Sequence, residues 1–186
     1  MKSVKNKQDV VAADFCGLPL KDHVVEYLER HGWEVTDVGV KKDDPDAEMF
    51  HRIGFKIGSM LAEGQFDRAL LFCGTGMGIH IAAGKVPGVQ CAVCESVPSA
   101  LRAATGNGCN ALSMGALYVA PQMGIEMAEA FLYHNMGDGY EDIDNWVPFH
   151  QVAYDEINNF DYAEYKKNGF KVIHGKDPEI GTYPRP

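Results

Sequence analysis

The sequence predicts an α/β protein, a Rossmann-like three-layer sandwich with a five-stranded parallel sheet and a C-terminal extension. Short apolar runs alternate with longer amphipathic stretches from residue 9 to about residue 133, and this alternation is typical of parallel sheets with right-handed crossovers. Residues 68–74 contain a continuous apolar run, Ala69 to Cys73, as expected of a central strand covered on both faces. We expect one α/β domain over residues 1–135 and an extension over residues 136–186.

Each half of the alternation has its own pattern. The expected strands are short stretches that are apolar or, at residues 33–40, alternate apolar and polar side chains; they lie at residues 9–14, 33–40, 68–74, 88–94 and 110–115. The expected helices carry apolar residues three and four positions apart, at residues 19–31, 47–64, 79–83, 98–105 and 121–133. In the first helix, Leu20, Val24 and Leu28 form one stripe, and Gly32 suits the C-terminal end.

The character of the chain changes after His134. Residues 135–146 are polar and rich in turn-forming residues, and residues 147–160 favour one more helix. The remainder is expected to be an extended tail. It is rich in aromatic side chains, namely Phe160, Tyr162, Tyr165, Phe170 and Tyr183. We therefore expect the C-terminal helix and tail to pack on the domain or on a neighbouring subunit.

Charge and composition argue against several classes of function. The chain has 186 residues, 17 Lys and Arg against 26 Asp and Glu, and a formal net charge of −9. Nucleic-acid phosphates and anionic lipids both need a basic face. No apolar run approaches the roughly 18 residues of a membrane span, and the N-terminal apolar run is too short for a signal peptide. We expect a cytoplasmic protein that binds neither nucleic acid nor membranes.

The five cysteines are Cys16, Cys73, Cys91, Cys94 and Cys109. The pair at 91 and 94 forms C-x-x-C, but neither a second such pair nor H-x-x-x-H follows. The pattern therefore does not indicate a metal site. Small, buried, reduced thiols are expected instead, and they fit a cytosolic compartment.

The sharpest local signal is the segment Cys73-Gly74-Thr75-Gly76-Met77-Gly78, which follows the third expected strand. In open α/β sheets, ligands bind at the carboxyl ends of strands. Glycines let backbone N–H groups approach a ligand, and the start of a helix favours negative charge, that of a thiolate included. The segment matches neither a nucleotide P-loop nor a dinucleotide G-x-G-x-x-G. On spacing alone, a tight turn beside a buried cysteine is the alternative interpretation.

Residues 9 to about 133 resemble the ribose-5-phosphate isomerase B and galactose-6-phosphate isomerase family. The C-G-T-G-x-G turn that begins at Cys73, with Ile-Ala-Ala-x-Lys at residues 81–85, is the most specific pairing. Asp14 at the end of the first strand, the Asp-x-Pro loop at 43–45 and Asn-x-x-Asn-x-Leu-x-x-Gly at 107–115 also match.

The resemblance implies an aldose–ketose isomerase of a small sugar or sugar phosphate, which works through an enediolate without metal or organic cofactor. It implies that Cys73 is the general base and that Thr75 lies near the reacting oxygens. The backbone N–H groups of Gly74, Gly76 and Gly78 would then hold the developing oxyanion.

The resemblance also implies substrate-binding roles and an assembly. Asp14 and Asn107 match positions that bind sugar hydroxyls. The implied pocket is shared between subunits of a homodimer or tetramer, so that Asn107 acts beside Cys73 of the partner subunit.

Four departures from the family pattern predict an atypical substrate. Gly106 stands where the family has a ring-opening His, and Phe15 and Leu117 replace a substrate-binding His and an Arg. Residues 138–142 occupy the region of the phosphate-binding arginines. We therefore expect a substrate that is already open, such as a tetrulose derivative, unless His80 supplies the missing acid.

A non-catalytic sugar-binding or scaffold subunit of a heteromeric isomerase is the alternative function. The missing His and Arg residues favour this alternative. The intact Cys73-Gly74-Thr75-Gly76 sequence favours an enzyme, because a non-catalytic subunit has no need of a thiol at the start of a helix.

Overall fold

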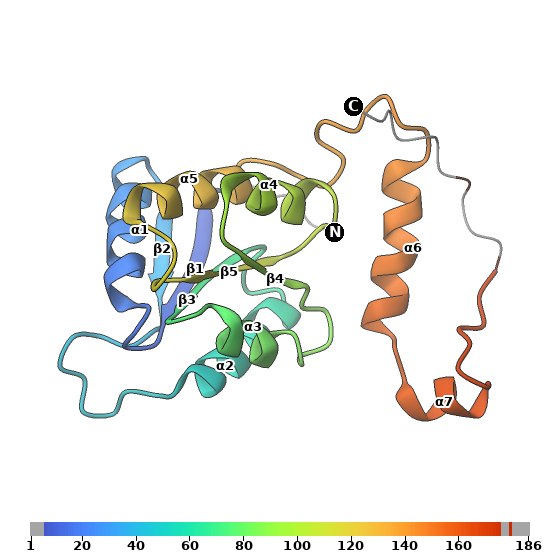
Figure 1. Ribbon diagram of the computed structural model, residues 1–186, viewed down its shortest axis with the longest axis horizontal. Helices are drawn as coiled ribbons and strands as arrows, with labels where there is room; N and C mark the ends of the chain where they lie inside the picture. Colours follow the sequence, from blue (N-terminus) through green and yellow to red (C-terminus); the bar gives the residue numbers. More distant parts are fainter. Residues whose placement is uncertain (1–5, 176–178, 180–186) are drawn as a thin grey trace. The chain divides into compact units, whose positions relative to one another are not determined.

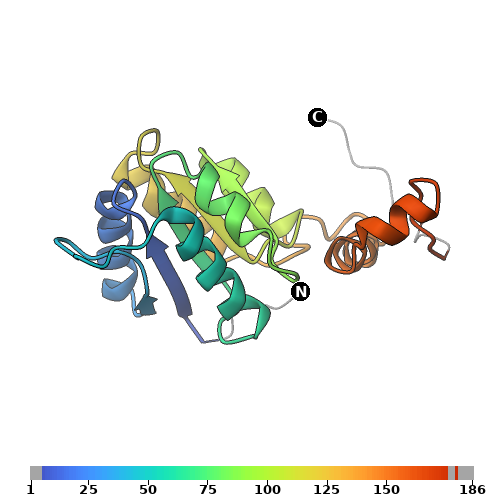
Figure 2. The ribbon, with the colours of Figure 1, turned by 90° about the horizontal axis from the view of Figure 1, so that it is seen from below.

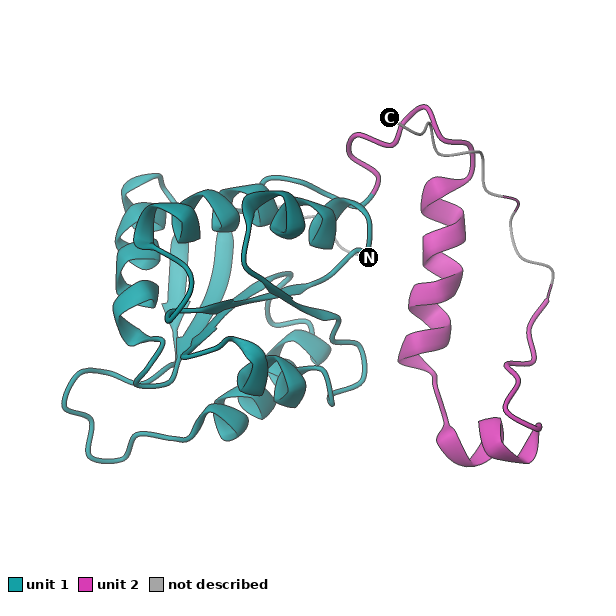
Figure 3. Ribbon diagram, viewed as in Figure 1, with its two compact units in different colours: residues 1–136 teal, residues 137–186 magenta. Residues whose placement is uncertain are grey.

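The structure of the protein is a computed structural model that describes residues 6–175 and residue 179. The chain divides into two compact units, Met1–Met136 and Gly137–Pro186, which Figure 3 shows in different colours. Among the described residues, no helix is both long and apolar enough to cross a membrane.

The first unit contains a five-stranded sheet in which every neighbouring pair is parallel. The strands are β1 (Gln8–Ala13), β2 (Glu34–Asp37), β3 (Ala69–Cys73), β4 (Cys91–Cys94) and β5 (Ala111–Gly115). Their order in the sheet is β2-β1-β3-β5-β4, so β3 is the central strand. The predicted fold class is thereby confirmed.

Helices cover both faces of this sheet. The helices of the first unit are α1 (Leu18–Arg30), α2 (Phe50–Ala62), α3 (Met77–Ala83), α4 (Val97–Thr105) and α5 (Pro121–Leu132). Helices α1, α4 and α5 lie on one face, and α2 and α3 lie on the other (Figures 1 and 2). Because strand side chains alternate, Val11 and Phe72 belong to the core under the first group, whereas Val10 and Leu71 belong to the core under the second.

The second strand is shorter than expected. Strand character was predicted for residues 33–40, but β2 ends at Asp37. There the Asp37 side chain accepts a hydrogen bond from the Gly39 amide at 3.0 Å, and this local bond competes with regular pairing. The chain nevertheless stays beside β1, because the Val40 amide donates to the Ala13 carbonyl at 2.9 Å.

The second unit contains α6 (Trp146–Asn158) and α7 (Tyr162–Lys167). Helix α6 matches the helix predicted over residues 147–160. The expectation of an extended tail after it is wrong at α7. Asp161 caps α7 by accepting a hydrogen bond from the Glu164 amide at 2.8 Å, and this Asp-x-x-Glu spacing is a helix-start signal. No residue of α6 or α7 is buried, and Tyr183 lies outside the described residues.

Candidate active site

Cys73 is the last residue of β3, so it lies at the carboxyl edge of the central strand. Its side chain is 4% exposed. The neighbouring strands end at the same level, because Phe72 is in register with Ala13 of β1 and Cys73 is in register with Gly115 of β5. This edge is where ligands bind in open parallel sheets, so the thiol stands at the expected position for chemistry.

The glycine-rich turn brings a hydrogen-bond donor to the Cys73 sulfur. The Gly76 amide donates to Sγ at 3.0 Å. Gly76 is the N-cap of α3 and has φ of +75°, a left-handed conformation that glycine adopts without a steric penalty. A thiolate accepts such a bond more strongly than a thiol does. The start of α3 therefore supplies this sulfur with a backbone hydrogen-bond donor.

The turn is packed tightly from two sides. A Cβ on Gly78 would lie 2.6 Å from the Phe50 ring at the start of α2, and a Cβ on Gly115 would lie 2.7 Å from the Thr75 carbonyl oxygen. Substitution at either position would push the turn away from its neighbours. The backbone N–H groups of the turn are therefore held in place by α2 and by the end of β5.

Thr75 lies inside this turn, and its side chain is already engaged. Its Oγ1 accepts a hydrogen bond from the Met77 amide at 3.2 Å. A hydroxyl has one hydrogen to donate besides its acceptor lone pairs. With Oγ1 receiving the Met77 amide, the Thr75 O–H can donate toward a substrate oxygen.

Asp14 follows β1 and links that strand to the site. Its Oδ1 accepts a hydrogen bond from the Gly17 amide at 2.9 Å, and its own amide donates to the Phe72 carbonyl at 3.2 Å. These two bonds hold the half-buried carboxylate beside the end of β3. Asp14, Cys73 and Thr75 therefore lie at the same carboxyl edge of the sheet.

Apolar side chains border the Gly74 end of the turn. A Cβ on Gly74 would lie 3.2 Å from Cys16 Cβ and 3.6 Å from Leu117 Cδ1. Leu117 is 71% exposed, and Phe15 beside Cys16 is also exposed. Phe15 and Leu117 occupy positions where the resemblance leads us to expect a His and an Arg. The rim of the site is therefore apolar on this side.

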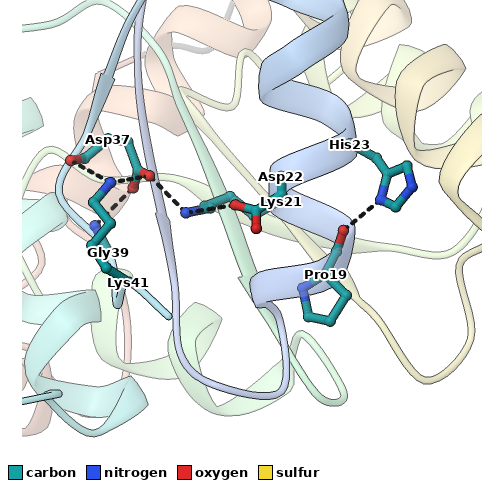
Figure 4. A network of polar contacts seen from close by, with 7 residues as sticks. All are labelled: Pro19, Lys21, Asp22, His23, Asp37, Gly39 and Lys41. Carbon is teal, nitrogen blue, oxygen red and sulfur yellow. Dashed lines mark hydrogen bonds and ion pairs between the residues drawn. The ribbon is translucent and has the colours of Figure 1, made fainter. Parts of the chain in front are cut away.

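A buried lysine holds the end of β2 (Figure 4). The sequence does not predict a charged group at this edge of the sheet. Lys21, in the first turn of α1, is 1% exposed, and its Nζ donates to Asp37 Oδ2 at 2.6 Å. Lys41 also donates to this carboxylate. Burial alone would raise the pKa of Asp37, but the hydrogen bonds from the two lysines outweigh burial and lower it. Lys21 stands four residues after Gly17 in the sequence, and nothing in that pattern indicates its partner.

Asn107 does not lie beside Cys73 of its own chain. Each crossover helix of a parallel sheet runs back from the carboxyl edge to the amino edge, and α4 ends just before Gly106 and Asn107. The next turn lies at the amino edge, where the Asn110 carbonyl accepts from the amide of Ala69, the first residue of β3. Asn107 is exposed there.

His80 lies one helical turn after Gly76 on α3. Its amide is 3.4 Å from the Gly76 carbonyl. Its Nδ1 is buried and has no hydrogen-bond partner among the described residues. The position beside the turn agrees with the sequence, but no contact in the described chain joins this ring to Cys73.

All five cysteines are free thiols. Burial raises the pKa of Cys91 far above its usual range and the pKa of Cys109 to about 12, so both stay protonated near neutral pH. Burial also raises the pKa of Cys94. Within the described ranges, no group of three His, Cys, Asp or Glu side chains is placed to hold a metal ion.

Comparisons with known proteins extend these observations. The family model described as ribose/galactose isomerase matches residues 10–144. The 4-deoxy-4-sulfo-D-erythrose isomerase of Clostridium sp. (strain MSTE9) is 34% identical over 159 residues, which cover 85% of this chain and 98% of the relative. The D-erythrulose-4-phosphate isomerase of Pectobacterium atrosepticum is 32% identical, over 66% of this chain and 80% of the relative.

Solved structures have the same fold. The ribose-5-phosphate isomerase B of Clostridium thermocellum superposes with a TM-score of 0.70 at 26% sequence identity. The match covers 87% of this chain and 99% of that structure.

Proposed function

The chain belongs to the ribose/galactose isomerase family and is an aldose–ketose isomerase, and we propose that its substrate is an open-chain four-carbon sugar with a terminal anion. In this proposal Cys73 is the base. The oxygen on which charge develops is bound by the N–H groups of Gly74, Thr75 and Gly78, the turn residues whose amides donate neither to the Cys73 sulfur nor to Thr75 Oγ1. The observation that carries the proposed role of Cys73 is the 3.0 Å hydrogen bond from the Gly76 amide to the Cys73 sulfur.

The proposed reaction moves one proton between C1 and C2. The Cys73 thiolate removes the proton from C2 of the aldose, and the electron pair passes to the C1 carbonyl oxygen to form an enediolate. The proton of the C2 hydroxyl then passes to the C1 oxygen, which leaves the negative charge on the C2 oxygen. The resulting thiol returns the proton to C1, and the ketose is formed. One base on one face of the sugar suffices for both steps, and fixed N–H groups stabilise the charge without reorganisation.

Thr75 and Asp14 take supporting roles in this proposal. The Thr75 O–H, set by the Met77 amide, donates to the oxygen that carries the developing charge. Asp14, held by the Gly17 amide, binds a sugar hydroxyl. Both side chains come from segments anchored to β3, so the distance between them and Cys73 stays fixed.

The absence of a ring-opening His at Gly106 supports an open-chain substrate. A four-carbon aldose closes a five-membered ring only through its 4-hydroxyl. In a 4-deoxy-4-sulfo sugar that hydroxyl is missing, and in a 4-phosphate it is blocked. Two relatives carry names that specify such four-carbon substrates. An isomerase of these sugars needs no acid to open a ring.

The apolar rim favours a sulfonate over a phosphate as the terminal group. A phosphate monoester carries about −1.5 to −2 charges at pH 7 and requires Arg forks or several donors, whereas a sulfonate carries a single charge. Phe15, Cys16 and Leu117 supply no cation at the rim. We therefore propose the sulfonated tetrose as the better substrate and the tetrulose phosphate as the second candidate.

We further propose a cytoplasmic homodimer, alone or paired into a tetramer, in which Asn107 of each subunit reaches the site of the other. Support comes from the position of Asn107 at the amino edge, away from the thiol of its own chain. The helices of the second unit bury none of their own side chains, so their apolar surface is suited to contact with another subunit or with the first unit.

The test measures aldose–ketose interconversion and solvent-deuterium incorporation next to the carbonyl. Substrates are 4-deoxy-4-sulfoerythrose, erythrose 4-phosphate and ribose 5-phosphate. We expect the highest kcat/KM with the sulfonated tetrose and the lowest with the ring-forming pentose. Cys73→Ala should lower kcat by about a thousandfold or more, whereas Cys91→Ala, which removes another thiol, should not. Wild-type turnover and exchange in Cys73→Ala would show that Cys73 is only a packing thiol.

A further inference from the structure

Ser113 is a buried hydroxyl in direct contact with the glycine-rich turn. It lies in the middle of β5 and is 0% exposed, and its Oγ donates to the Gly76 carbonyl at 2.6 Å. The other β5 residues are Ala, Leu, Met and Gly, and an alanine would fill this position without a polar group. Burying a hydroxyl is unfavourable unless it forms a hydrogen bond. The geometry therefore ties the serine to Gly76.

This hydrogen bond orients the backbone group that faces Thr75. The Gly76 carbonyl and the Met77 N–H belong to one planar peptide group, so fixing the carbonyl also fixes the N–H. That N–H donates to Thr75 Oγ1 at 3.2 Å. Because hydrogen-bonded groups polarise one another, donation to the carbonyl also makes the Met77 N–H a stronger donor.

The same bond restrains the donor to the sulfur. The Gly76 N–H, which reaches Cys73 Sγ, is separated from the anchored peptide group only by the φ and ψ of Gly76, +75° and −18°. Glycine resists rotation about these bonds less than any other residue. The helical bond to the Gly76 carbonyl, from the His80 amide, is 3.4 Å long. The shorter bond from Ser113 is therefore the stronger restraint.

We propose that Ser113 is a positioning residue for the isomerase reaction, because its hydroxyl holds the Gly76 carbonyl and thereby sets the N–H groups that act on the Cys73 sulfur and on Thr75. The inference rests on the proposed role of Cys73 as the base. Ser113 touches neither the thiol nor the substrate, and it acts only through the backbone of the turn.

The test compares Ser113→Ala with Thr105→Val, a matched control. Thr105 is equally buried, and its Oγ1 donates to a backbone carbonyl, that of Leu101, at 3.0 Å, but it lies on α4 away from the turn. Both variants lose one buried hydrogen bond and should unfold at similarly reduced temperatures. Only Ser113→Ala should lower kcat, by about tenfold with KM changed less than about twofold.

A second readout needs no substrate. This readout is the rate at which iodoacetamide alkylates Cys73, with peptide mapping to separate Cys73 from the exposed Cys16. The rate should fall in Ser113→Ala and stay unchanged in Thr105→Val. Ser113→Thr, which retains the hydroxyl, should recover kcat and the alkylation rate.

The outcomes separate this inference from the proposed function. If Cys73→Ala is inactive but Ser113→Ala keeps wild-type kcat and alkylation, the role of Ser113 is refuted and Cys73 still stands as the base. The role of Ser113 is also refuted if Thr105→Val slows turnover as much as Ser113→Ala. If Cys73→Ala retains turnover, the proposed function fails, and the alkylation rate alone then decides whether Ser113 acts on the sulfur.

Discussion

Gly17 lies against the backbone of Cys73. A Cβ added to Gly17 would stand 2.7 Å from the Cys73 amide nitrogen and closer still to the Phe72 carbonyl group. Gly17 is also the residue whose amide holds the Asp14 carboxylate. The loop after β1 and the end of β3 are thereby fixed to one another by direct backbone contact.

This contact predicts that Gly17→Ala destabilises the protein and impairs its activity. Gly17 has an ordinary helical conformation, so the penalty comes from overlap, which costs about 1–3 kcal/mol in a packed interior. Gly84→Ala is the control, because the nearest atom to its Cβ would be 3.4 Å away. Urea unfolding should show a lower midpoint for Gly17→Ala alone. Equal stability of the two variants would contradict the prediction.

The buried carboxyl of Asp9 leads us to expect that the free energy of unfolding falls as the pH rises. This carboxyl in β1 is 0% exposed, and burial raises its pKa well above the usual value, an effect only partly offset by the Val10 backbone and Arg68. The folded state therefore keeps the proton when the unfolded chain releases it near pH 4, and the free energy of unfolding falls from there upward. Asp9→Asn should remove this contribution and be more stable near pH 7. A variant with the wild-type pH dependence between pH 4 and 7 would rule out this role.

Asp37 predicts the opposite dependence on pH. Because the hydrogen bonds from Lys21 and Lys41 lower its pKa against the effect of burial, its stabilising contribution is present above the unfolded pKa of about 3.9 and disappears as the pH falls through the folded value. Asp37→Asn should lose about 3 kcal/mol near neutral pH, because Lys21 stays buried without its main partner.

The control for Asp37 is an exposed ion pair on the same helix as Lys21. Glu26→Gln removes the ion pair between Glu26, whose side chain is 58% exposed, and Arg30, whose side chain is 73% exposed. This substitution should lower the free energy of unfolding by less than about 1 kcal/mol. Thermal unfolding at pH 3 and pH 7 measures both variants. A loss in Asp37→Asn no larger than that in Glu26→Gln would show that Lys21 needs no partner.

The proposed shared site predicts complementation between two inactive variants. Cys73→Ala lacks the base, and Asn107→Ala lacks the residue proposed to reach the partner's site. Mixed dimers would contain one site that is intact in both residues. Random exchange of equal amounts should therefore restore about a quarter of wild-type activity. Subunit exchange is verified by mass spectrometry. If activity does not rise on mixing, either Cys73 and Asn107 of the same subunit form one site, or Asn107 is not part of the site.

The sequence predicts those features that depend on local pattern. The central strand β3 is an apolar run and β2 shows strand-like alternation, and the thiol at Cys73 is recognisable because the glycines that surround it are adjacent in the chain. The contacts that the sequence does not predict join distant segments. Ser113 meets Gly76 only because β5 lies next to β3, and Lys21 meets Asp37 only because β2 lies beside β1.

Single side-chain hydrogen bonds also decide where helices and strands begin and end. A prediction based on the pattern of apolar residues misses these bonds. The side chain of Asp37 turns the chain at Gly39 although the alternation continues to Val40. Asp161 starts a helix in a stretch that has no apolar periodicity. Both residues act through a single hydrogen bond to a nearby amide, which hydrophobic patterning does not register.

The location of Cys73 on the central strand has a consequence for how the substrate specificity of such an enzyme evolves. Residues of β3 are enclosed on all sides, so a substitution there disturbs the whole sheet. Phe15 and Leu117 are exposed on loops, where a substitution costs little stability. Selection for a new sugar should therefore collect mutations at these two positions and spare the turn from Cys73 to Gly78, so that the substrate changes while the proposed base is kept.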